Sequence, residues 1–365
     1  MKKRNANVDL LRIIATLLVV LLHVLGKGGI LKNASPEGSV YWVAWLLETG
    51  AYCAVNCFAL ISGYVMMDKK IKATNLLGLW MQIIFYSLLL SGLFFAFVPE
   101  SRTLQNFVPT VLPILGNQWW YTSQYFALFC FMPFLNKAIQ SISQHTYRKF
   151  LIVVFLAVCC ASCIIPIDAF ALNDGYSPAW LMIGYLLGAY IKKYQLQKKI
   201  TAAKSILGFS AMILLAFASK LAIHFATKLI FGAAQFDGTF ISYPSILIIL
   251  ASIFLLLFCL NIKLSVFSEK VIRFFAPATL GVFLLHSHPL VVRYLLADSL
   301  LPLINRSPLV MVVGVTAATL AIFVLCSGLD WLRIQLFKLL RVDKLCEFIH
   351  HKFTELYLKI FKDQK

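Results

Sequence analysis

Charged residues are scarce in this chain of 365 residues, and acidic residues are the scarcest. Asp, Glu, Lys and Arg together make up 13% of the sequence, whereas 61% of the residues are hydrophobic. A soluble globular domain carries about twice that share of charge. The mean hydropathy is +0.84, and apolar runs long enough to cross a bilayer recur along the chain. The composition therefore excludes an ordinary soluble domain and predicts a polytopic helical membrane protein.

The sequence also lacks the cysteine spacing of a metal site. Its nine cysteines fall mostly inside apolar runs, including Cys159, Cys160 and Cys163. Membrane cysteines usually pack as small apolar side chains, so we expect no metal and no disulfide. The sequence shows no internal repeat and no low-complexity stretch, and we expect no appended soluble domain. Residues 1–345 are predicted to form one membrane unit, followed by a basic cytoplasmic tail at residues 346–365.

The apolar runs predict an all-α fold with about ten transmembrane helices. The connection at residues 99–118 has an apolar core of its own, which is compatible with a short interfacial helix or with a plain loop. The predicted spans lie near residues 8–26, 46–67, 76–98, 119–138, 150–167, 178–191, 203–231, 243–262, 276–296 and 308–337.

Basic residues predict the orientation of these spans. The chain holds 33 Lys and Arg residues against 15 Asp and Glu residues. Most of the basic residues fall on one side of the membrane, together with both termini, and the positive-inside rule assigns that side to the cytoplasm. Because these residues are spread over short loops, we expect no nucleic-acid partner despite the net charge of +18. Asp9 and Arg12 interrupt the first apolar run, so we expect it to be retained rather than cleaved as a signal peptide.

The first predicted span contains three ionisable residues, Asp9, Arg12 and His23. Eleven residues turn an α-helix about 20° past three full turns. Arg12 and His23 therefore project from nearly the same face, about 16 Å apart along the axis, and Asp9 lies about one turn before Arg12. Ionisable groups at membrane depth are costly, so this stripe indicates a functional cavity.

Other polar groups are predicted at or near membrane depth. His286 is expected near the midplane of the ninth span, where Pro289 is expected to open or kink the helix. Glu48 is expected at the outer headgroups. Lys220 and His224 share a face of the seventh span and are expected at an interface.

Each of these polar groups also has a structural explanation. Arg12 can snorkel to the headgroups beside Asp9, and an intramembrane histidine often makes an interhelical hydrogen bond. Two histidines at mid-depth with an aligned arginine nevertheless favour a polar cavity. Histidine acts as a general base or nucleophile and arginine binds phosphate, which is typical of group transfer. Protonatable side chains are equally compatible with a secondary carrier.

A series of ordered landmarks makes the chain resemble the membrane acyltransferase-3 family, which O-acylates surface glycans. Within the family it is most similar to the enterobacterial common antigen O-acetyltransferase type. The resemblance covers nearly the whole chain and implies a ten-span unit with both termini in the cytoplasm. The landmarks are Arg12 with His23, the Ser62-Gly63-Tyr64 segment, Trp120 with Pro133, the segment IGYLLG at 183–188, and residues 279–286 ending in His286.

The resemblance also implies roles for individual residues. His23 corresponds to the family's catalytic histidine; Asp9 is expected to orient Arg12, and His286 to support the acceptor or assist proton transfer. Acetyl-coenzyme A is the expected acyl donor, bound from the cytoplasm. After Ser-Gly-Tyr the family often has arginines, where this chain has lysines that neutralise phosphate without bidentate geometry. The residues expected to contact the donor are Arg12, Tyr64, Lys69 and Lys72.

The sequence thus predicts an O-acetyltransferase of the bacterial inner membrane. It is expected to move an acetyl group from cytoplasmic acetyl-coenzyme A to a hydroxyl of a cell-surface or lipid-linked glycan. Membrane lipids and the glycan or lipid-linked oligosaccharide are the expected partners. The alternatives are a carrier or flippase for a glycan or its lipid-linked precursor, without acyl-transfer chemistry, and a purely structural subunit. The last leaves the stripe of Arg12 and His23 without a purpose.

Overall fold

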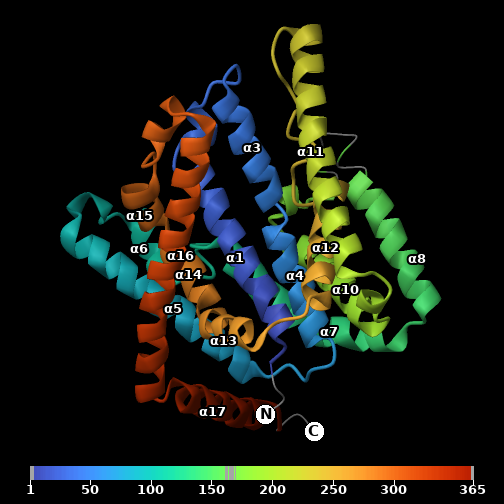
Figure 1. Cartoon of the computed structure of the whole chain (residues 1–365). Coiled ribbons are helices and arrows are strands. Elements are labelled where there is room, and N and C mark those ends of the chain that lie inside the picture. Colours follow the sequence, from blue (N-terminus) through green and yellow to red (C-terminus); the bar gives the residue numbers. More distant parts are fainter. Residues whose placement is uncertain (1–3, 161–162, 164–167, 169, 363–365) are drawn as a thin grey trace.

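A computed structural model describes residues 4–160, 163, 168 and 170–362, and Figure 1 shows its arrangement. These residues form helices and connections without a β-strand, which confirms the predicted all-α class. The end of the predicted fifth span, including Pro166, lies outside the described residues. The α-helices are α1 (Ala6–Gly26), α2 (Ile30–Asn33), α3 (Ser39–Ala51), α4 (Ala54–Met66), α5 (Ala73–Phe97), α6 (Leu104–Val111), α7 (Trp120–Ser141), α8 (Gln144–Val154), α10 (Pro178–Lys193), α11 (Ala202–Phe231), α12 (Ile246–Asn261), α13 (Val266–Phe275), α14 (Thr279–His286), α15 (Pro289–Val291), α16 (Pro308–Leu339) and α17 (Val342–Lys362).

Several of these helices are long and apolar enough to cross a bilayer. A further candidate span is the pair Val266–His286 and Pro289–Leu296, which bends by 60°. The bend falls where Pro289 was expected to break the ninth span, and it confirms that prediction. Since α10 and α12 have only 16 residues each, the total of ten spans and the cytoplasmic location of the termini stay predictions. The five candidate spans are Ala6–Asn33, Ser39–Met66, Ala73–Phe97, Ala202–Phe231 and Pro308–Leu339.

Helix α1 lies at the centre of the bundle, where it contacts α3, α4, α12, α14 and α16. The Asn5 side chain caps its first turn by accepting a hydrogen bond from the Asn7 amide. Of its most apolar stretch 56% is buried, against 17% for α11 and 22% for α16. The polar side chains of α1 therefore face other helices rather than lipid, which α11 and α16 are placed to meet.

Glycines bring α4 and α10 into close contact. A Cβ atom on Gly63 would clash with the Tyr185 carbonyl, and one on Gly188 would clash with the Leu60 carbonyl. Only glycine permits backbones to approach this closely. The two glycine-containing landmarks of the sequence are therefore the two sides of one helix crossing.

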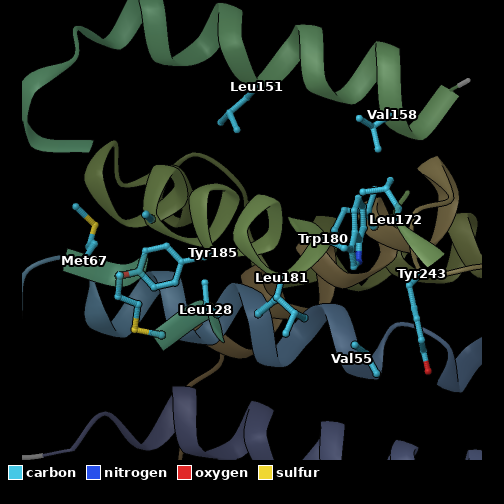
Figure 2. Close-up of a cluster of buried hydrophobic side chains, with 14 of the residues drawn as sticks. Val55, Met67, Leu128, Leu151, Val158, Leu172, Trp180, Leu181, Tyr185 and Tyr243 are labelled. Carbon is cyan, nitrogen blue, oxygen red and sulfur yellow. The ribbon is translucent and has the colours of Figure 1, made fainter. Parts of the chain in front are cut away.

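Buried amides and aromatic rings add polar contacts around this crossing. Asn56 of α4 accepts a hydrogen bond from the Trp180 indole at 2.8 Å and donates to the Tyr243 carbonyl at 2.9 Å. Figure 2 shows Trp180 and Tyr185 of α10 in the apolar cluster, with Val55 on the neighbouring α4. These interhelical hydrogen bonds satisfy groups that lipid cannot satisfy.

The two ends of the bundle differ. The end that holds Asn5 and α17 is called the terminal end below, and the opposite end, from which α11 projects, is called the distal end (Figure 1). Helix α17 begins at Val342, so the predicted tail at residues 346–365 belongs largely to a helix. The connection at 99–118 contains the short helix α6, which packs on α5.

A buried ion network lies where α11 meets the connection to α12. Lys220 is 1% exposed, and its Nζ lies 2.9 Å from Asp237 and 3.7 Å from the centre of the Trp45 ring. His224 Nδ1 lies 3.0 Å from the same carboxylate. Burial raises the pKa of Asp237, but the hydrogen bonds from His224 and Lys220 outweigh it and hold that pKa below 3.8. Lys220 is thus buried inside the protein, and its location at a membrane interface stays a prediction.

Candidate functional site

A cavity of about 870 Å³ runs along one face of α1. Arg12, Thr16, Val19, His23 and Lys27 line it from the terminal to the distal end, at the spacing of three and four residues that marks one side of a helix. These fifteen residue steps span about 22 Å. The expectation that Arg12 and His23 face one polar cavity is therefore met.

Two histidines from α1 and α14 meet at the wall of this cavity. His23 Nδ1 lies 2.9 Å from His286 Nε2, and His286 Nδ1 lies 2.6 Å from the Val282 carbonyl oxygen. Because a carbonyl only accepts, His286 Nδ1 carries a proton, and the Nε2 of the neutral ring accepts. His23 Nδ1 then donates to His286, and His23 Nε2 keeps its lone pair.

The two histidine rings differ in their access to the cavity. His23 lines the cavity, while His286 is 3% exposed and is not among the lining residues. His286 therefore holds the His23 ring from behind, as the orienting group of a nucleophile or base does. His288 points away from this pair and lies 2.7 Å from the Gln118 amide nitrogen.

At the terminal end, Asp9 holds two arginines. Its carboxylate lies 2.6 Å from Arg12 Nη1 and receives two hydrogen bonds from Arg4, at 3.0 and 2.9 Å. Asp9 is 2% exposed and does not line the cavity, whereas the Arg12 side chain is 27% exposed and does. The structure thus places Asp9 behind Arg12 rather than beside His23.

The other residues expected at the donor lie around this end. Lys69 is exposed, and partial burial with the charges of Arg12 and Lys192 lowers its pKa. Lys69 is therefore part of one basic group with Arg12. Lys72 is exposed at the start of α5, and the Tyr64 ring lies 6.0 Å from the Lys192 ammonium. None of Lys69, Lys72 and Tyr64 is among the residues that line the cavity.

Sequence reasoning missed the distal half of the cavity. There Glu48 lines the wall and is 7% exposed, and its depth at the outer headgroups stays a prediction. Tyr52, Trp120, Tyr176 and Tyr243 line the same part of the wall. The sequence predicts Trp120 as a landmark of the fourth span and as part of an aromatic belt near the outer ends of the spans. The available signal was the placement of these aromatic residues at helix ends and in connections on one side of the bundle.

The cavity holds no candidate metal centre in the part of the chain that the structure describes, where no group of three or more His, Cys, Asp and Glu side chains converges. Its distinctive groups are instead Arg12 at the terminal end and the paired histidine His23 within. The fold and this site define a polytopic helical membrane protein with ionisable side chains along a cavity inside the bundle.

Comparison with known families identifies the class further. A family model described as an acyltransferase domain matches residues 5–328. The chain therefore belongs to the acyltransferase-3 family, and a membrane acyltransferase is confirmed at that level. All residues that line the cavity, from Arg12 to Val292, fall inside the matched range. No curated protein and no solved structure matches the chain.

Proposed function

We propose that this protein is an O-acetyltransferase of the bacterial inner membrane. It transfers the acetyl group of cytoplasmic acetyl-coenzyme A to a hydroxyl of a cell-surface or lipid-linked glycan, for example one of the enterobacterial common antigen type. The observation that carries the proposal is a single cavity that joins Arg12 to an oriented histidine, His23. Family membership supports the acyl-transfer chemistry.

In this proposal the terminal end faces the cytoplasm and receives the donor. Arg12 offers hydrogen-bond donors to phosphate, and Asp9 acts as a positioning residue that fixes its guanidinium. Lys69 and Lys72 add positive charge around the entrance, where Tyr64 lies beside Lys192. Such a basic entrance favours the phosphates of coenzyme A through charge.

His23 is the proposed general base. Its Nε2 takes the proton of the acceptor hydroxyl while the hydroxyl oxygen attacks the thioester carbonyl carbon. The C–S bond then breaks, the acetyl group stays on the acceptor oxygen, and the proton passes from His23 to the departing thiolate. His286 accepts the hydrogen bond from His23 Nδ1 throughout and stabilises the transient imidazolium.

Transfer of labelled acetyl from acetyl-coenzyme A to membrane glycan, catalysed by the purified protein in liposomes, tests the proposal. His23→Ala is expected to lower the rate about 10²- to 10⁴-fold, the range for loss of a general base. His145→Ala is the matched control, because His145 is exposed at the start of α8. An unchanged rate in His23→Ala would remove the catalytic assignment.

A thermal-shift titration with coenzyme A separates this enzyme from a glycan carrier, which needs the same cavity but no donor site. The enzyme is expected to show saturable stabilisation. Arg12→Lys is expected to raise the apparent Kd about tenfold, since lysine loses the planar fork. Stabilisation by glycan alone would favour the carrier.

A further inference from the structure

Glu48 lines the cavity and holds a carboxyl oxygen that has no hydrogen-bond partner. The side chain is 7% exposed, and its Oε2 atom is buried and makes no hydrogen bond. Glu48 belongs to α3 and lines the distal half of the cavity. A buried polar group normally has a partner, because its lost hydration is otherwise uncompensated. This carboxylate is therefore suited to a ligand that donates hydrogen bonds.

Four aromatic side chains surround the same space. Trp120 and Tyr176 have ring centres 4.3 Å apart, Tyr176 and Tyr243 5.1 Å, and Tyr52 and Tyr243 5.2 Å. Glu48 and these four side chains line the same cavity. The rings offer flat apolar faces with polar tips, next to one strong acceptor.

This combination selects a class of ligand. A hydrocarbon or a simple alcohol would leave much of the acceptor capacity of Glu48 unused. A ring that carries several hydroxyl groups satisfies both features, since its hydroxyls donate to the carboxylate while its C–H face packs on an aromatic ring. The chemistry therefore points to a pyranose sugar.

We propose that Glu48, Tyr52, Trp120, Tyr176 and Tyr243 form a sugar-binding subsite in which Glu48 accepts hydrogen bonds from ring hydroxyls of the acyl acceptor. The inference rests on the proposed acetyl transfer for the meaning of "acceptor", and it adds the residues that hold the sugar. His23 and Glu48 line one continuous cavity, so a sugar bound at Glu48 shares its space with the base.

The test is direct binding of methyl glucopyranoside to the full-length protein in a sugar-free detergent, followed by saturation-transfer NMR without any donor. Glu48→Gln, which keeps the shape and replaces one carboxyl oxygen by an amide NH2 group, is expected to raise the Kd about tenfold, the loss typical of a hydrogen bond that leaves its partner unpaired. Glu37→Gln is the matched control, because Glu37 is an exposed carboxylate at the same end. Cyclohexanol, a ring with a single hydroxyl, is expected to bind far more weakly than the sugar.

Stabilisation by coenzyme A is expected to be equal in wild type and Glu48→Gln, which shows that the variant is folded. The proposal is overturned if methyl glucopyranoside does not bind, if Glu48→Gln binds it as tightly as wild type, or if cyclohexanol binds as well. Loss of the coenzyme A response in Glu48→Gln would also overturn it, by showing a general structural role. Because the binding assay contains no donor, a failure of acetyl transfer alone would count against the proposed function and leave the sugar subsite standing.

Discussion

Replacing His286 with alanine is expected to slow acetyl transfer without weakening donor binding. The substitution removes the acceptor that lies 2.9 Å from His23 Nδ1, so the proton on His23 is no longer confined to that nitrogen. A hydrogen bond to a group that becomes charged during the reaction contributes about 1.5–3 kcal/mol. The corresponding fall in kcat is roughly 10- to 150-fold.

Two measurements separate this role from a merely structural one. Nitrogen-15 NMR of labelled histidine reports which ring nitrogen of His23 carries the proton, and this signature is expected to change in His286→Ala. His286→Gln restores a side-chain acceptor and is expected to retain more activity than His286→Ala. The reasoning fails if His286→Ala keeps the wild-type kcat, or if kcat falls while the His23 tautomer stays the same.

Three further outcomes follow from the structure. Asp9→Asn weakens the hold on Arg12 and is expected to raise the Kd for coenzyme A about 3- to 10-fold in a thermal-shift titration, with kcat nearly unchanged. Gly188→Ala inserts a methyl group against α4 and is expected to destabilise the protein by about 1–3 kcal/mol, whereas Gly92→Ala in α5 meets open space and is expected to be neutral or stabilising in the same thermal melts. Asp237 stabilises the fold while it is ionised, because its pKa is lower in the folded protein than in the unfolded chain. The Tm advantage of wild type over Asp237→Asn is therefore expected to be full above pH 3.8 and to disappear as the pH falls through the lowered pKa of the folded state. A Tm advantage that is independent of pH would contradict this.

The alignment of Arg12 with His23 was predictable because it depends only on the pitch of one helix. The break at Pro289 was predictable for a similar local reason, the missing amide and the ring of proline. The glycine landmarks could also be recognised in the sequence, but the helix crossing that they form could not be predicted. Gly63 and Gly188 face each other only because α4 crosses α10, and no local rule specifies which helices cross.

The surroundings of Glu48 and Lys220 could not be predicted from hydropathy. Both residues are expected at a membrane interface from the sequence. The tertiary structure buries both, Glu48 in the cavity wall and Lys220 against Asp237 and Trp45. Hydropathy measures how readily a segment enters lipid. It carries no information about which side chains of another helix will pack over a given residue of that segment.

The sequence by itself therefore determined the helical membrane class, the family and the polar stripe on α1, since each is a property of composition, ordered landmarks or one helix. Tertiary structure alone decided that His286 meets His23, because 263 residues separate them along the chain. It likewise decided that Glu48 and four aromatic rings share a cavity with His23. The physical reason is that a site inside a bundle is assembled across helix interfaces, where packing rather than local pattern chooses the neighbours.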